Sequence, residues 1–189
     1  MAETILKGLA KPRLSVKVQT IAAIAAIIGA VAVPQLFHAL GAVSGLGTSL
    51  GETFLPMHLP IILVGLLAGP YAGAVAGLLG PLASFAISHM PSEVMLPFMM
   101  TELCAYGLFA GLLRNVKLPT IVKVLAVQIG GRAVRAAAIL ISVYGLGNER
   151  VNVATIRMSI VTGLFGILLQ WALIPLIVYR VENLKKHES

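Results

Sequence analysis

Residues 52–114 read ETFLPMHLPIILVGLLAGPYAGAVAGLLGPLASFAISHMPSEVMLPFMMTELCAYGLFAGLLR, and the rest of the chain is arranged around them. This stretch contains three apolar runs separated by two breaks with glycine or proline. The runs are continuous and do not alternate between apolar and polar residues, so helices are expected rather than strands. A few isolated ionisable side chains stand out against them, namely Glu52, His58, His89, Glu93 and Glu102. Such groups are rare in apolar segments and mark candidate functional positions.

The composition of the whole chain indicates that its solvent is a lipid bilayer. Of the 189 residues, 58% are hydrophobic and 11% are charged, whereas a soluble domain carries about 25% charged residues. A helix that crosses a bilayer needs about 20 apolar residues, and its backbone groups must be paired within the segment. The continuous runs therefore predict an all-α, polytopic membrane protein and not a β-barrel. With one cysteine, Cys104, no intrachain disulfide is expected.

The apolar runs predict six transmembrane helices in a single membrane domain that covers residues 1–189. The first helix is expected at 18–33, where Pro34 ends it. The connection that follows, 34–56, is rich in glycine and polar residues, and we expect it to form an outer loop or a re-entrant segment. The remaining helices are expected at about 57–68, 71–88, 94–113, 118–144 and 155–179.

The distribution of basic residues predicts that the N- and C-termini are both cytoplasmic. Six crossings bring the two ends to one side, where residues 1–17 form a basic segment and residues 181–189 a short tail. Ten of the fourteen basic residues then lie on that side, as the positive-inside rule requires. These residues cluster at helix ends and do not form a stripe with aromatic residues, so no nucleic-acid partner is expected.

Two arginines are predicted within the fifth helix, where a charge is costly. Arg132 and Arg135 share one helix face with Gln128, and this face should point into the bundle because an arginine at the bilayer centre costs about 2.5 kcal/mol or more. Glu102 on the fourth helix is the expected carboxylate partner of one arginine, which leaves the other free to receive an anionic or polar ligand. An internal ion pair between Arg132 and Glu102, without any ligand, is the alternative.

Further polar groups are predicted at the outer ends of the helices. Glu52 and His58 precede the second helix, and together with His89 and Glu93 they are candidates for the rim of an outward-facing pocket. Histidines that simply reach toward the membrane interface are the alternative. No metal site is expected, since the histidines lack the i, i+4 spacing of a metal-binding helix.

Motifs of catalysis are missing from the sequence. There is no G-x-S-x-G elbow, no H-E-x-x-H pair and no C-x-x-C, and the chain contains no aspartate. A phosphate-binding G-x-x-x-x-G-K-[ST] loop is also absent, so the chain is expected to bind no cofactor and to need partner subunits if ATP drives its activity. The sequence thus does not predict an enzyme.

Small residues recur along the first helix at the spacing of one helical turn. Ala22, Ala26 and Ala30 share a face, and Ala25 and Gly29 lie on the adjoining stripe. Small residues at this spacing allow a second helix to approach closely in lipid. The face is therefore predicted to contact either a partner protein or another helix of the same chain.

Four segments together resemble one family of membrane proteins. They are LPMHLPIILVGLLAGPYAGAVAGLLGPLASF, MPSEVMLPFMMTELCAYGLFAGLL, IGGRAVRA and TGLFGILLQWALIPLIV. In combination they are similar to the substrate-binding subunits, or S components, of energy-coupling-factor (ECF) vitamin transporters, over about residues 16–180.

The resemblance implies a six-helix subunit in the cytoplasmic membrane of a prokaryote that binds a vitamin with high affinity from outside. Such subunits associate with a transmembrane coupling protein and two cytoplasmic ATPases, which hydrolyse ATP. The resemblance implies that Ala22, Ala26 and Ala30 contact the coupling protein and that 34–56 is an outer gating loop. The candidate substrate-binding residues are Arg132, Arg135, Gln128, Glu102, His58, Glu52 and His89.

The single tryptophan, Trp171, narrows the class of vitamin. A flat ring held between several aromatic side chains is not expected. A flexible, anionic compound such as pantothenate fits an arginine site better than a B6 vitamer, a pyrimidine precursor or a corrinoid. A stand-alone secondary transporter or channel, and an intramembrane enzyme or scaffold, remain the alternative functions.

Overall fold

The computed structural model describes residues 14–47 and 49–187, except for the side chains of residues 49, 50, 52 and 185–187. All regular elements within these ranges are helices, so the predicted all-α class is confirmed. Five helical segments are long and apolar enough to cross a membrane. They are α2 (Val16–Ser44), α5 (Pro70–Ser88), α6 (Leu96–Leu113), α7 (Thr120–Leu140) with the π-helix η1 (Ile141–Gly145), and α9 (Leu164–His187).

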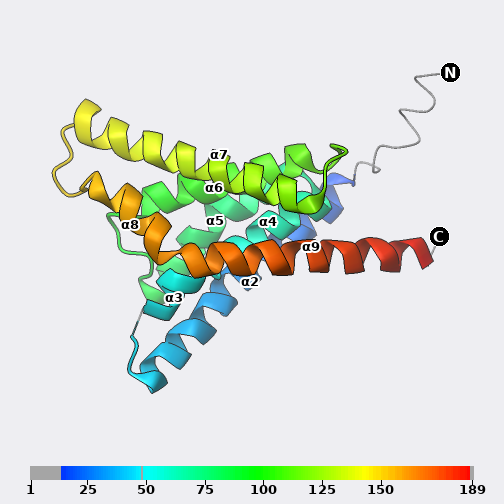
Figure 1. Cartoon of the computed structure of the whole chain (residues 1–189), viewed down its shortest axis with the longest axis horizontal. Helices are drawn as coiled ribbons and strands as arrows, with labels where there is room; N and C mark the ends of the chain where they lie inside the picture. The colour runs from blue at the N-terminus through cyan, green and yellow to red at the C-terminus, as the bar shows by residue number, and fades with distance from the viewer. Residues whose placement is uncertain (1–13, 48, 188–189) are drawn as a thin grey trace.

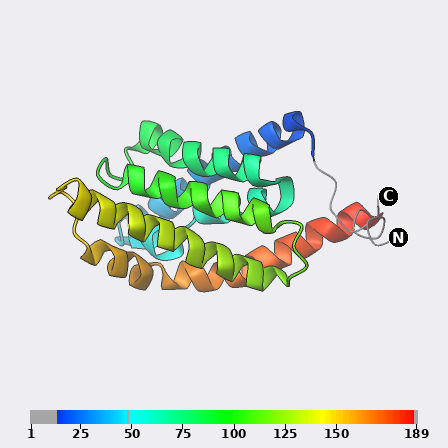
Figure 2. The same ribbon diagram turned by 90° about the horizontal axis from the view of Figure 1, so that it is seen from above.

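The helices form an elongated bundle, which Figure 1 shows from the side and Figure 2 from above. Helices α4 (His58–Ala68), α5, α6, α7 and α9 run side by side along the long axis. Helix α2 crosses the bundle obliquely, and its C-terminal part extends away from the other helices (Figure 1). The beginning of α2 and the end of α9 lie toward the same end of the molecule.

Glycines bring the backbones of α5 and α6 into direct contact. A Cβ atom at Gly107 of α6 would overlap the carbonyl oxygen of Gly73 on α5, and one at Gly77 would overlap that of Leu103. A Cβ atom at Gly65 of α4 would come within 2.6 Å of the Gly107 oxygen. Because lipid gives no hydrophobic driving force between helices, such close packing is what holds them together. These three helices form the centre of the bundle and provide the wall on which the polar residues are placed.

The prediction that Pro34 ends the first helix is wrong, because α2 continues to Ser44. A proline inside a helix removes one backbone hydrogen bond, which a membrane helix tolerates when neighbouring groups compensate. Pro34 is buried, and the helix ends where Gly45 adopts a left-handed φ of 73°. The expected connection at 34–56 therefore contains the last turns of α2 and a short helix, α3 (Ser49–Phe54).

The last predicted helix is divided into two. Helix α8 (Ala154–Thr162) ends at Gly163, and α9 begins at Leu164 and continues to His187, so most of the expected tail is helical. At Gly163, an added Cβ atom would come within 2.7 Å of Leu55. The segment between α3 and α4 thus packs into the corner between α8 and α9. The other predicted helices agree with α4, α5, α6 and α7 with η1 to within two residues at each end.

Candidate functional site

Glu102 lies at the centre of the polar groups within the bundle. It is fully buried on α6, and so is Tyr106 one turn later, which is 1% exposed. The i, i+4 spacing places both side chains on one helix face, and the Tyr106 hydroxyl donates to Oε1 of Glu102 over 3.1 Å. One carboxylate oxygen is therefore satisfied within α6 itself.

The second carboxylate oxygen of Glu102 faces α7. Arg135 donates from Nη1 to Glu102 Oε2 over 2.8 Å, and the Arg135 side chain is only 13% exposed. The prediction that Glu102 pairs with one of the two arginines is confirmed, but the partner is Arg135 and not Arg132. A buried, hydrogen-bonded pair of this kind offsets the desolvation of both charges.

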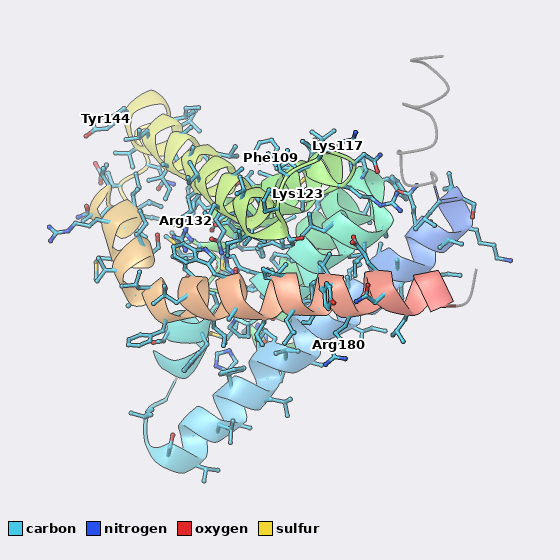
Figure 3. All side chains as sticks on the ribbon, turned by 45° about the vertical axis from the view of Figure 1, so that its right-hand side comes forward. Phe109, Lys117, Lys123, Arg132, Tyr144 and Arg180 are labelled. Atoms are coloured by element: carbon cyan, nitrogen blue, oxygen red, sulfur yellow. The ribbon has the colours of Figure 1, made fainter. Side chains whose placement is uncertain are left out.

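Arg132 has no carboxylate partner in the described part of the chain. Its Nη1 donates to the carbonyl oxygen of Ser159 on α8 over 3.4 Å, and Figure 3 shows it between α7 and the corner where α8 meets α9. Within the described ranges, the Nε atoms of Arg132 and Arg135 are buried and have no hydrogen-bond partner. One guanidinium group is thus paired with the acid and the other is not, and both keep an unused Nε donor.

A small cavity lies beside the two arginines. It is bounded by Arg132 and Arg135 on α7 and by Ile156, Ser159 and Ile160 on α8. Its volume of about 10 Å³ is close to the smallest space that holds one water molecule. The structure therefore shows a closed site, and a larger ligand requires α8 to move away from α7.

A second polar network begins at Gln128, one turn before Arg132 on α7. Gln128 on α7 donates to Oε1 of Gln170 on α9 over 2.9 Å, and the indole Nε1 of Trp171 donates to Oε1 of Gln128 over 2.6 Å. Gln170 donates in turn to the carbonyl oxygen of Leu55 over 3.4 Å. This network connects α7 and α9 to the link between α3 and α4.

His58, the first residue of α4, adds a buried imidazole to the cluster. It is 3% exposed, and the centroid of its ring lies 5.3 Å from that of Tyr106. Its Nδ1 atom is buried and has no hydrogen-bond partner among the described residues. His58 therefore belongs to the interior of the bundle, not to an outer rim.

Of the three other predicted rim residues, His89 and Glu93 do not join this cluster, and Glu93 is exposed between α5 and α6. His89 is exposed at the end of α5, where it adopts a left-handed φ of 56° and packs edge-on against Phe85 at 5.8 Å. The side chain of Glu52 lies outside the described part of the structure. No group of three possible metal ligands occurs in the described ranges.

The small-residue face of α2 lies mostly inside the chain. Ala26 is 7% exposed and Ala30 is fully buried, and a Cβ atom added to Gly80 of α5 would lie 3.3 Å from that of Ala30. Ala22 is half-buried. The structure thus uses Ala26 and Ala30 for packing within the chain, which was the alternative to a partner contact.

Several site residues were missed from the sequence, namely Tyr106, Ser159, Gln170 and Trp171. Tyr106 could have been found, because it lies one turn from Glu102. Gln170 is an isolated amide in an apolar run, which is a similar signal. Ser159 contacts Arg132 through its backbone carbonyl, which every residue has, so the amino-acid sequence gives no sign of this contact.

Compared with known protein families, with curated proteins and with solved structures, the chain matches none of them. The site must therefore be interpreted from its own chemistry. It offers two guanidinium groups, an amide pair, an indole and one carboxylate that is already paired. Such a set of donors is chemically suited to a negatively charged or strongly polar group.

Proposed function

We propose that the chain is the substrate-binding S component of an ECF-type vitamin transporter and that its ligand is a small anionic vitamin. The observation that carries this proposal is Arg132, a half-buried guanidinium beside the Glu102–Arg135 ion pair, whose carboxylate is already neutralised by Arg135. A charged group inside a membrane bundle is a functional position by default, because its burial is costly unless something repays it.

The balance of charges favours a ligand with one negative charge. Arg132, Arg135 and Glu102 together carry one net positive charge among the described side chains of the site. A carboxylate or phosphate that receives the free donors of Arg132 would neutralise this charge with bidentate hydrogen bonds. Pantothenate, with one carboxylate, hydroxyl groups and an amide, fits the guanidinium and amide donors of the site.

The arrangement of the helices is compatible with six crossings. Helix α4 has 11 residues, so it spans only about 17 Å and cannot cross the bilayer alone. Together with α3 it forms an interrupted element over residues 49–68. We assign this element as one further crossing, in addition to the five long helical segments. Lys117 and Arg180 lie toward the end of the molecule at which α9 ends (Figure 3), and we assign this end to the cytoplasm.

The proposed partners are a transmembrane coupling protein and two cytoplasmic ATPases, since the chain has no ATP-binding loop. Helix α2 still offers small residues to such a partner. Ala22 and Gly29 are half-buried, and Ala25 and Ala32 are exposed. These four residues, spaced i, i+3, i+7 and i+10, form the small-residue stripe of α2, which is placed for close contact with another membrane helix.

Identification of a co-purified ligand tests the proposal. The detergent-solubilised chain is purified from cells grown in rich medium and denatured, and the released small molecules are identified by mass spectrometry. We expect one anionic vitamin from the wild type. We expect its loss from Arg132→Gln and its retention in Arg157→Gln, which removes an exposed arginine of α8.

Two results would contradict the proposal. The first is a wild-type protein that releases no ligand and shows no thermal shift with a panel of carboxylate- and phosphate-bearing vitamins. The second is equal ligand retention in the Arg132→Gln and Arg157→Gln variants.

A stand-alone secondary transporter is the second candidate function, and interrupted helices favour it. The break between α3 and α4 packs against the break between α8 and α9, through Leu55 and Gly163. Broken helices that meet near a polar site are typical of secondary transporters. Uptake of the identified ligand into liposomes that contain only this chain would favour this second function.

A further inference from the structure

A groove lies at the end of the bundle opposite the end of α9. It runs between the start of α6 and the end of α7, and it has a volume of about 580 Å³. Its position and walls separate it from the arginine cavity, which lies between α7 and α8. This volume is within the range of pockets that bind small molecules.

The walls of the groove are mainly apolar. Val94, just before α6, and Pro97 and Phe98 of α6 line one side, and Ala138, Ile141 and Leu146 line the other. Phe98 is buried, whereas Ile141 is 63% and Leu146 78% exposed. Large exposed apolar residues at the end of a membrane-spanning helix are expected to contact lipid. Because Ile141 and Leu146 also line the groove, an acyl chain of the surrounding lipid can enter it from the side.

Two opposite charges line the same groove. Glu93 precedes α6, and Arg150 follows η1; both are exposed. The described structure contains no ion pair between them. Each of them can therefore bind a different charged group of the same ligand.

The loop that carries Arg150 is fixed by hydrogen bonds at the groove. The side chain of Asn148 donates to Oγ of Ser142 over 3.0 Å, and its backbone N–H donates to the Ser142 carbonyl oxygen over 3.0 Å. The backbone N–H of Arg150 donates to Oδ1 of Asn148, also over 3.0 Å. The guanidinium is thus attached to a loop that is anchored to η1.

We propose that this groove binds a zwitterionic phospholipid with a primary ammonium group, such as phosphatidylethanolamine. The ammonium group donates to the Glu93 carboxylate, Arg150 binds the phosphate, and one acyl chain lies along Pro97 and Ile141. The two charges favour a zwitterion over an anionic lipid. A primary ammonium donates hydrogen bonds to a carboxylate, which the trimethylammonium of phosphatidylcholine cannot do. This proposal does not rest on the proposed transport function.

Lipid retention measured by native mass spectrometry tests this proposal. The full chain is placed in an equimolar mixture of phosphatidylethanolamine, phosphatidylcholine and phosphatidylglycerol, and the lipids that stay bound are quantified. We expect phosphatidylethanolamine to be enriched about three- to tenfold over phosphatidylcholine, as one solvent-exposed hydrogen bond implies. Glu93→Gln should abolish this preference, and Arg150→Gln should reduce the retention of all three phospholipids.

Neighbouring charges outside the groove provide matched controls. Glu149→Gln and Arg157→Gln each remove one exposed charge that does not line it, so both should retain lipid as the wild type does. Thermal melting of each variant checks that it is folded. Equal retention of the three lipids by the wild type would overturn the proposal. The proposal would also be overturned if Glu93→Gln and Glu149→Gln had equal effects on lipid retention. Occupation of the groove by a water-soluble molecule only would overturn it as well.

Discussion

Glu102 is held by one donor on each of its carboxylate oxygens. Tyr106 satisfies one from the same helix, and Arg135 satisfies the other from α7. Removal of one member of a buried ion pair leaves the other charge desolvated, whereas removal of both does not. The Glu102–Arg135 pair therefore stabilises the packing of α6 against α7. Arg132 does not take part in it, and its described contact is one long hydrogen bond to a carbonyl oxygen.

At the residue scale we predict that Arg135→Gln lowers the free energy of unfolding by about 3–5 kcal/mol, because it leaves the Glu102 carboxylate buried and unpaired. The double variant Glu102→Gln with Arg135→Gln should recover a large part of this loss. Thermal melting in detergent measures both, with Arg157→Gln as the exposed control. A double variant that is no more stable than the single one would show that the pair is not what stabilises this region.

The sequence predicted a Glu102–arginine pair but could not say which arginine takes part. Arg132 and Arg135 are less than one turn apart and both face inward. The choice depends on how α7 is rotated against α6 and α8, which is set by side-chain packing and not by spacing along the chain. The same holds for Gln128, whose partners on α9 lie more than 40 residues away in sequence.

Two neighbouring stripes of small residues give α2 two kinds of contact. Ala26 and Ala30 pack within the chain, whereas Ala25 and Ala32 of the small-residue stripe are exposed. Exposed small residues gain little from contact with lipid chains. They instead allow the backbone of another membrane helix to approach α2 closely.

At the element scale we predict opposite effects for leucine at two positions of α2. Ala30→Leu should destabilise the chain by about 1–3 kcal/mol, because the added atoms have no space next to Gly80. Ala25→Leu should leave the melting temperature unchanged and abolish co-purification of the ATPase subunits from host membranes. Loss of stability in Ala25→Leu, or intact co-purification, would contradict the assignment of the stripe.

The boundaries of α2 and of the last helix show where prediction of the elements failed. Pro34 is a helix breaker by local rules, but these rules refer to water, and inside a bilayer a helix is the best state for the following apolar residues. The break at Gly163 lies against Leu55, more than 100 residues earlier in the chain. Hydrophobic periodicity contains no information about such a contact. It did predict the other helices, several of whose ends lie beside a glycine or a proline.

At the scale of the whole molecule, the direction of the helices in the bundle can be tested against the distribution of charge. The loop between α5 and α6 and the turn between α6 and α7 lie at opposite ends of the bundle (Figure 2). Ser92 is exposed in the first and Lys117 in the second. The proposed topology places the first outside the cell and the second in the cytoplasm.

We predict that a membrane-impermeant maleimide applied to bacterial spheroplasts labels Ser92→Cys but not Lys117→Cys. Both variants are made with Cys104→Ala, so that each chain contains a single thiol. Lys117→Cys should become labelled once the membrane is permeabilised, which shows that the residue is reactive. The reverse pattern would contradict cytoplasmic termini.

The arginine without an acid partner also has an electrical consequence. A membrane potential of 100 mV does about 2.3 kcal/mol of work on one elementary charge that crosses the membrane. The empty site carries the charge of Arg132 uncompensated by any described carboxylate, so its displacement along the field depends on voltage. Under the proposed function, a bound monoanion would make the site neutral, and the occupied site would then move without electrical work. Voltage would accordingly act on the return of the empty subunit and not on the inward delivery of its ligand.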